Sequence, residues 1–224
     1  MSFPWRESLD SSGDRASPSL RVSTSTLPKP IDSVGPIRAL GMLMKSEFRV
    51  SVFVFSLVTA YLLATNLKPN FLLLGELIVA WYFVTFGVYV LNDLTDVKED
   101  RIDHPTRPFA SGKISVRDGW IIFATSAGIS FVVSIAISVT CFILVLAAFL
   151  LGVAYSHPAI RAKKQFPLKI LVSIPGAVLC SLCGGIVAGN LDGPVIFSAI
   201  FFGLFSLVTL LLGDVSDVPG DTAA

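Results

Sequence analysis

The feature that most constrains the fold is a long stretch without charge: from residue 119 to residue 160 the chain contains no Asp, Glu, Lys or Arg. One helix of that length would reach about 60 Å at 1.5 Å per residue. The hydrocarbon core of a bilayer is only about 30 Å thick. The stretch therefore predicts two membrane-spanning helices joined by a tight turn, which we place around Ser138 to Cys141.

The composition extends this prediction to the whole chain. Of the 224 residues, 53% are hydrophobic and 15% are charged, and the mean hydropathy is +0.75, which is far more apolar than an ordinary soluble domain. We therefore predict an all-α, polytopic transmembrane helical bundle with about six apolar spans of about 20 residues each. They begin near Val50, Phe71, Gly119, Thr140, Leu168 and Pro194.

The basic residues predict an orientation. Lys and Arg concentrate before the first span and in the segments 98–117 and 161–169. With six spans, these segments and the C-terminus share one side of the membrane, which the positive-inside rule assigns to the cytosol. The connectors near Lys68 and Asp192 then lie on the opposite side.

The segment 1–40 is rich in Ser, Thr and Pro, so we expect a disordered tail before a transmembrane domain at 41–224. It lacks the apolar core of a cleavable signal peptide. Glu7, Asp10 and Asp14 argue against a mitochondrial transit peptide, and we expect a multi-pass protein of the endoplasmic reticulum.

One acidic pattern, D-x-x-D-x-x-x-D, occurs after two different spans. It comprises Asp93, Asp96 and Asp100, and then Asp214, Asp217 and Asp221. Steps of three and four residues place each set on one face of a helix. A solvated acidic loop is the alternative, but chance rarely repeats all three offsets. Like charges about 4 Å apart repel by about 4 kcal/mol at an effective dielectric constant near 20, so converging carboxylates need cations.

Asn92 continues the first pattern, because Asn92, Asp96 and Asp100 follow one another at intervals of four. Amide and carboxylate oxygens suit Mg²⁺, whereas zinc prefers Cys and His ligands. The pattern therefore predicts bound Mg²⁺ and metal-bridged diphosphate chemistry. The predicted metal ligands are Asn92, Asp93, Asp96, Asp100, Asp214, Asp217 and Asp221.

Basic and hydroxyl side chains lie near both patterns and can bind diphosphate oxygens. The candidates are Arg107, Lys113, Tyr155, Arg161 and Lys164. For the cluster 161–164, an anchor at the cytosolic membrane surface is an equally weighted alternative.

These motifs resemble the UbiA-type intramembrane prenyltransferase family from about residue 40 to the C-terminus. The resemblance rests on Asn92-Asp93-x-x-Asp96-x-x-x-Asp100, Arg107-Pro108, Ser111-Gly112, Tyr155-Ser156 and Asp214-x-x-Asp217-x-x-x-Asp221. The segment 99–108 is similar to fungal branches that include membrane terpene cyclases. Family members usually have nine spans, so the resemblance implies a domain that is incomplete at its C-terminus.

The resemblance implies a central cavity whose cytosolic mouth binds Mg²⁺ and a prenyl diphosphate. Ionisation of the diphosphate would give a carbocation that alkylates a lipophilic, often aromatic acceptor. Asp96, Asp217, Arg107 and Tyr155 would then be catalytic, and Asn92, Lys113, Arg161 and Lys164 would bind the diphosphate. The expected partners are these two substrates and membrane lipid, without nucleic acid.

Two alternatives to this enzyme remain open. A membrane terpene cyclase would use the same metals and no acceptor, and an inactive truncated relative would keep the motifs without turnover. A homo-oligomer could supply the missing wall of the cavity.

Four further features bear on packing or chemistry, and all but the glycines have two interpretations. Cys180 and Cys183 form a Cys-x-x-Cys pair, for which we favour helix packing over metal or redox chemistry. Glu76 either has an interior partner or reaches the near membrane interface. Glycines at 184, 185 and 189 predict close helix packing. Aromatic residues could line the cavity or simply pack: Trp81, Tyr82, Phe86, Tyr89, Phe201, Phe202 and Phe205.

Overall fold

The computed structural model describes residues 36–221 except 47–48, 158–159, 161 and 163–164. The side chains of residues 36–37, 45–49, 166 and 213–221 also lie outside the description. Most of the predicted tail therefore falls outside the described residues, and the first helix begins within its last five positions, at Pro36.

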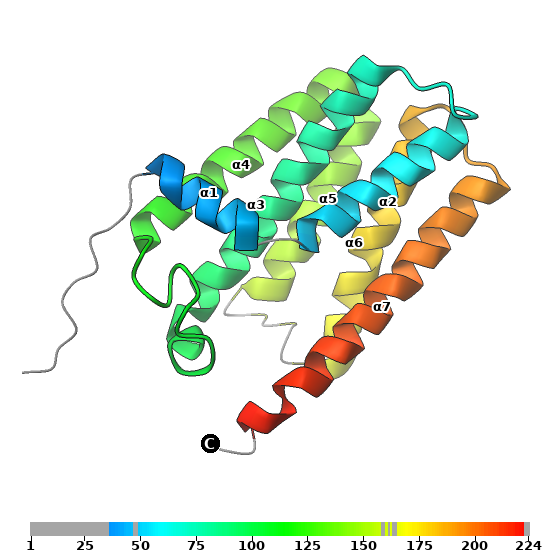
Figure 1. Ribbon diagram of the computed structural model, residues 1–224. Coiled ribbons are helices and arrows are strands. Elements are labelled where there is room, and N and C mark those ends of the chain that lie inside the picture. The colour runs from blue at the N-terminus through cyan, green and yellow to red at the C-terminus, as the bar shows by residue number, and fades with distance from the viewer. Residues whose placement is uncertain (1–35, 47–48, 158–159, 161, 163–164, 222–224) are drawn as a thin grey trace, which may run out of the picture. The chain divides into compact units, whose positions relative to one another are not determined.

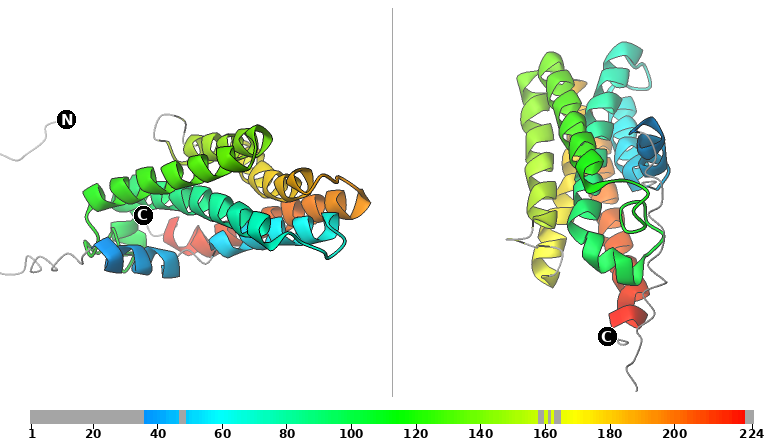
Figure 2. Two further views of the ribbon diagram at one scale, coloured as in Figure 1. Left: turned by 90° about the horizontal axis from the view of Figure 1, so that it is seen from above. Right: turned by 90° about the vertical axis from the view of Figure 1, so that its left-hand side faces the viewer.

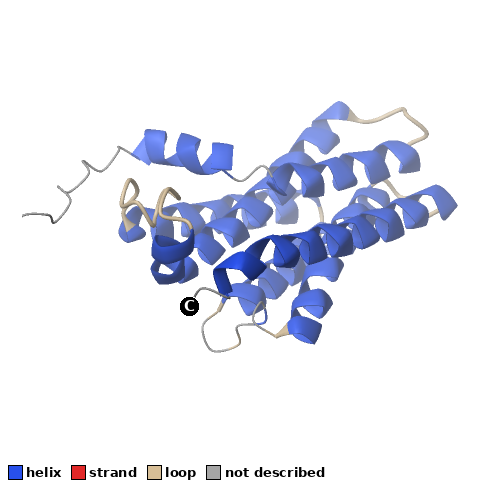
Figure 3. Ribbon diagram, turned by 60° about the horizontal axis from the view of Figure 1, so that its bottom comes forward, coloured by secondary structure: helices blue, strands red, loops and turns tan. Residues whose placement is uncertain are grey.

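The described residues form seven helices and no strands (Figures 1 and 3), which confirms the predicted all-α class. They are α1 (Pro36–Ser46), α2 (Arg49–Ala64), α3 (Phe71–Asp103), α4 (Val116–Ile137), α5 (Val139–Ser156), α6 (Phe166–Val187) and α7 (Gly193–Asp221).

Five of these helices, α3 to α7, are long and apolar enough to cross a membrane, rather than the six predicted. The exception is α2, which begins at the predicted place but has only 16 residues. At 1.5 Å per residue it reaches about 24 Å, less than the thickness of a bilayer core. The chain reverses directly after it, where Asn66 and Leu67 adopt positive φ angles of 51° and 60°.

The predicted hairpin in the uncharged stretch is confirmed, and it turns on one residue. Ser138 ends α4 by donating its backbone N–H to the Ser134 carbonyl at 3.1 Å. Its hydroxyl oxygen also accepts a hydrogen bond from the backbone N–H of Cys141 at 3.0 Å, at the start of α5. One serine therefore caps two helices.

The helices surround a space between α2, α3, α5, α6 and α7. Helix α3 packs against α2, α4 and α5, and α6 packs against α2, α5 and α7. The end of α3, the end of α5, the start of α6 and the end of α7 lie at the same end of the bundle (Figures 1 and 2). Both acidic patterns are therefore carried on helices that end on one side.

Close packing of α6 against α2 depends on Gly184. A Cβ atom there would lie 2.6 Å from the Leu57 carbonyl oxygen and 3.1 Å from the Tyr61 backbone nitrogen. Backbone atoms cannot move aside as side chains do, so Gly184→Ala is expected to lower the free energy of unfolding by about 1–3 kcal/mol. Denaturant unfolding in detergent micelles measures this.

Gly128→Ala is the matched control, because a Cβ atom at that position on α4 meets no atom within 4 Å. It is expected to stabilise the helix by up to about 1 kcal/mol, since Ala is the better helix former. Equal destabilisation by both variants would contradict the proposed contact.

Candidate functional site

A cavity of about 360 Å³ lies between α2, α3, α5, α6 and α7. Its size is at the small end of ligand pockets, and most of its lining is apolar. Helix α3 contributes one face at steps of three and four residues, as a helix beside a cavity should. Those residues are Trp81, Val84, Thr85, Val88, Tyr89 and Asn92.

Four polar side chains of the lining lie toward one end of the cavity, whereas others, such as Ser56 and Thr85, line the rest of it. Asn92 on α3, Tyr155 on α5, Lys169 on α6 and Thr209 on α7 are the polar lining residues of these helices that lie nearest the end of the bundle where α3 finishes. Four helices therefore converge to give an apolar cavity a mouth with amide, phenol, ammonium and hydroxyl groups.

The first acidic pattern is helical throughout, because α3 continues to Asp103. Asp93 and Asp100 are buried, with 3% and 6% of their surfaces exposed. The Arg107 Nη1 atom donates to both carboxylate oxygens of Asp100, at 2.9 and 3.0 Å, and lies 3.8 Å from Asp93 Oδ1. Such charge-assisted bonds offset the cost of burying carboxylates.

The loop after α3 brings Arg107 back to the helix that it follows. The backbone N–H of His104 donates to the Asp100 carbonyl at 2.9 Å and ends α3, and the N–H of Arg107 donates to the His104 carbonyl at 3.0 Å. Phe109 and Ile114 are buried in an apolar cluster with residues of α1 and α3. Their burial fixes the loop and thereby the guanidinium.

Asn92 connects the pattern to α5. Ser156 Oγ donates to Asn92 Oδ1 at 3.4 Å, and Thr95 Oγ1 donates to the Asn92 carbonyl at 2.9 Å. Tyr155, beside Ser156, lines the cavity. The Tyr155-Ser156 segment and the first acidic pattern are thus neighbours in space.

The structure brings some predicted site residues together and leaves others apart. Arg107 joins Asp93 and Asp100 in one ion-paired group, Asn92 bonds to Ser156 on α5, and Tyr155 lies at the cavity mouth. Lys113 is half-buried on the loop and is not among the described residues that line the cavity. Its predicted contact with diphosphate therefore has no support from its position.

The predicted seven-ligand metal set extends beyond the described side chains. Asp96 is half-buried, between Asp93 and Asp100 on α3. Within the described part of the chain, no three His, Cys, Asp or Glu side chains converge as a metal site. Helix α7 continues through the second pattern, but the side chains of Asp214, Asp217 and Asp221 lie outside the described residues, as do Arg161 and Lys164.

Sequence reasoning missed Lys169 as a site residue, because it was counted only as part of the basic membrane surface. It lines the cavity with Val172, Ser173 and Gly176 of α6. Their spacing of three and four residues was readable from the sequence, but the face of α6 that turns inward was not.

The aromatic candidates divide between the cavity and the packed interior. The residues that line the cavity are Trp81, Tyr89, Phe202 and Phe205, and the described lining does not include Tyr82, Phe86 or Phe201. Phe86 is buried in the apolar cluster beside the loop. Glu76 is exposed, which favours the interface interpretation over an interior partner.

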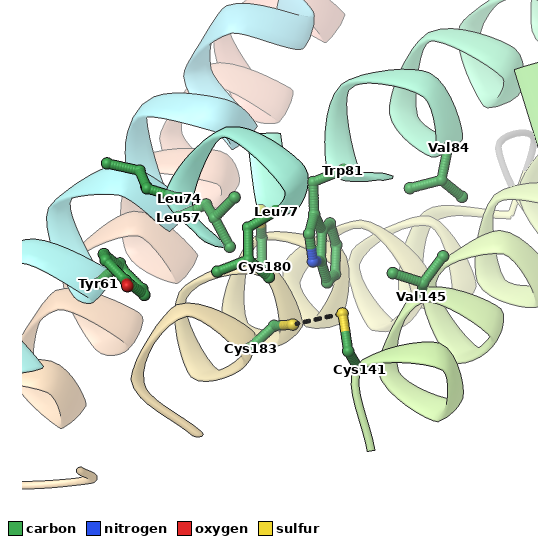
Figure 4. Packing of buried hydrophobic residues seen from close by; sticks show 10 residues of the cluster. All are labelled: Leu57, Tyr61, Leu74, Leu77, Trp81, Val84, Cys141, Val145, Cys180 and Cys183. Carbon is green, nitrogen blue, oxygen red and sulfur yellow. Dashed lines mark hydrogen bonds between the residues drawn. The ribbon is translucent and has the colours of Figure 1, made fainter. Parts of the chain in front are cut away.

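The cysteines belong to the packed core beyond the cavity (Figure 4). Cys183 Sγ lies 3.7 Å from Cys141 Sγ, and the Cys180 thiol donates to the Phe53 carbonyl at 3.0 Å. Each partner is on a neighbouring helix, so the helix-packing interpretation of the Cys-x-x-Cys pair agrees with the structure.

Comparison with known proteins supports the resemblance. Residues 52–224 match the model of the UbiA prenyltransferase family. A digeranylgeranylglyceryl phosphate synthase of Sulfolobus acidocaldarius is 29% identical over 178 residues, covering 77% of this chain and 62% of the relative. A probable homogentisate phytyltransferase 1 of Oryza sativa is 30% identical over 236 aligned positions, covering 97% and 58%.

The fold agrees as well. A UbiA homologue from Archaeoglobus fulgidus, solved with GPP and Mg²⁺, superposes with a TM-score of 0.64 at 20% identity, covering 83% of this chain and 65% of that one. The chain therefore belongs to the UbiA prenyltransferase family of membrane helical bundles. It spans about six tenths of the length of the curated relatives that it matches.

Proposed function

We propose that this protein is an intramembrane prenyltransferase that transfers the prenyl group of a prenyl diphosphate to a lipophilic acceptor. The observation that carries the proposal is an apolar cavity whose polar mouth includes Asn92, the residue directly before the first acidic pattern. A prenyl diphosphate has the same two-part chemistry, with an apolar chain and a polar, anionic head.

The residues at the end of α3 fit Mg²⁺ by their chemistry, since they offer amide and carboxylate oxygens. Two buried carboxylates, Asp93 and Asp100, both lie close to the guanidinium of Arg107. We propose that Asn92, Asp93, Asp96 and Asp100 hold Mg²⁺ together with Asp214, Asp217 and Asp221 of the second pattern. When bound, Mg²⁺ would neutralise the diphosphate as a leaving group.

The protein's own side chains act on the remaining parts of the substrate. Tyr155 and Lys169 lie at the mouth, where a phenol and an ammonium group can donate to diphosphate oxygens. Deeper in the cavity, apolar walls exclude water from the allylic cation. The faces of Tyr89, Phe202 and Phe205 can stabilise that positive charge.

The direct experiment follows the product. Membranes that contain the chain are incubated with farnesyl or geranylgeranyl diphosphate and a panel of acceptors that includes homogentisate, with Mg²⁺ or with EDTA. Prenylated acceptor that forms only with Mg²⁺ is the expected result. A terpene hydrocarbon formed without any acceptor would instead establish the cyclase alternative, and absence of both products would overturn the proposal.

Lys169 provides a second test of the same function. Lys169→Met is expected to raise the KM for the prenyl diphosphate about tenfold, because a hydrogen bond to a charged group contributes about 1.5–3 kcal/mol. Lys169→Arg keeps the charge and should retain most of the affinity. Lys68→Met, in the exposed connection at the far end of the bundle, is the control; an equal change in KM there would refute the role of Lys169.

A further inference from the structure

The cavity has a closed end as well as a mouth. On α3 its lining begins at Asn92 and ends at Trp81, eleven residues earlier. At 1.5 Å per residue these positions are about 16 Å apart along the helix axis. On α5 and α6 the lining also stops, at Ala148 and Ala177.

A packed core closes the bundle beyond Trp81 (Figure 4). Trp81 itself has 1% of its surface exposed, and Leu77, one turn further along α3, has none. Tyr61 and the three cysteines belong to the same cluster. The indole therefore lies between an open cavity and a filled interior.

The choice of a tryptophan at this position has a cost. The nearest partner of the indole Nε1 is the Cys183 thiol, and it makes no hydrogen bond of standard geometry to a nitrogen or oxygen atom within the described residues. Sulfur is a weak acceptor, so burying the indole N–H there is unfavourable. Phenylalanine would avoid the cost but is smaller. The property that distinguishes Trp81 from a phenylalanine at this position is therefore the larger size of its ring.

We propose that Trp81 sets the depth of the cavity and limits the prenyl chain that fits inside it to about three isoprene units. Three backbone bonds span 3.80 Å, so the four chain bonds of one isoprene unit extend about 5 Å. The distance from Asn92 to Trp81 thus accommodates about three units, the length of a farnesyl group. This inference rests on the proposed function, because it takes the diphosphate to sit at the mouth.

Binding measures the depth directly and does not require turnover. The probes are farnesyl and geranylgeranyl S-thiolodiphosphates, whose sulfur makes them poor substrates, with Mg²⁺ and purified protein in detergent. The wild-type protein is expected to bind the geranylgeranyl probe no more tightly than the farnesyl probe, because the fourth isoprene unit finds no room in the cavity. Trp81→Ala should favour the geranylgeranyl probe about tenfold over the farnesyl probe, a typical gain when a pocket admits further apolar groups.

A second variant makes the cavity shallower instead of deeper. It keeps the proposal testable if Trp81→Ala does not fold. Val84 lines the cavity one turn nearer the mouth than Trp81. Val84→Trp should therefore shorten the cavity by about one unit and weaken the farnesyl probe about tenfold relative to geranyl S-thiolodiphosphate. The matched control is Phe86→Ala, a buried aromatic residue of α3 outside the described lining, and it should leave these ratios unchanged.

The outcomes separate the two proposals. Ratios that stay constant in both Trp81→Ala and Val84→Trp would overturn the role of Trp81, even if the protein forms prenylated product. Shifted ratios without any product would support the depth limit and count against the proposed transferase activity. If the wild-type protein bound none of the three probes, both the depth limit and the proposed transferase activity would be overturned.

Discussion

Asp96→Ala is expected to reduce the formation of prenylated product at least about a hundredfold. Changing even the outer partners of a metal ligand typically costs 10–100-fold in metal affinity or activity, and loss of a ligand should cost more. Asp96 lies one turn of α3 from Asp93 and from Asp100, within the group proposed to hold Mg²⁺. Initial rates with farnesyl diphosphate over a range of Mg²⁺ concentrations measure the effect, and excess Mg²⁺ should restore part of it.

The control is Asp103→Ala, which removes an exposed carboxylate from the last position of the same helix. It should retain nearly full activity. Asp217→Ala extends the test to the second pattern and should be as damaging as Asp96→Ala. Normal turnover in both motif variants would exclude the assignment of these aspartates to the metal site.

Arg107→Ala is expected to destabilise the protein by about 3 kcal/mol when Mg²⁺ is absent. Removing one partner of a buried ion pair costs 3–5 kcal/mol because the other charge stays buried. The side chain of Arg107 is 35% exposed, whereas the side chain of Asp100 is 8% exposed. Because one partner of the pair is partly solvated, we expect a loss at the lower end of this range. Mg²⁺ should stabilise the variant more than the wild type, since the ion replaces the lost positive charge.

Unfolding midpoints in detergent, with Mg²⁺ or with EDTA, measure this difference. Arg101→Ala removes an exposed guanidinium from the last turn of α3 and is the matched control. If Arg107→Ala and Arg101→Ala lost equal stability, or if Mg²⁺ shifted both midpoints equally, Arg107 would not be the countercharge of the pattern.

The features that depend on local pattern could be predicted from the sequence. The uncharged stretch required a hairpin because of its length, and the turn falls at Ser138, within the predicted range. The acidic spacing implied one helical face, and α3 continues through Asp100. Both inferences need only the geometry of a single helix and the thickness of a bilayer.

Features that depend on how helices meet could not be predicted in the same way. The inward position of Lys169 follows from the rotation of α6 against its three neighbours, α2, α5 and α7. The bond from Arg107 to Asp100 requires a loop that turns back on its own helix and is fixed by Phe109 and Ile114. Helix α2 is shorter than the predicted span because it ends at Ala64, just before the positive φ angles of Asn66 and Leu67 reverse the chain.

The double cap at Ser138 has a consequence for how the chain enters a membrane. The bilayer core offers no hydrogen-bond partner to exposed backbone groups. A break between two helices is therefore unfavourable during insertion unless the chain's own atoms bond the backbone groups at the break. Ser138 supplies an acceptor to α5 and a donor to α4 through its own atoms. The α4–α5 hairpin therefore brings part of its own hydrogen bonding into the membrane, which lowers the cost of inserting the two helices together.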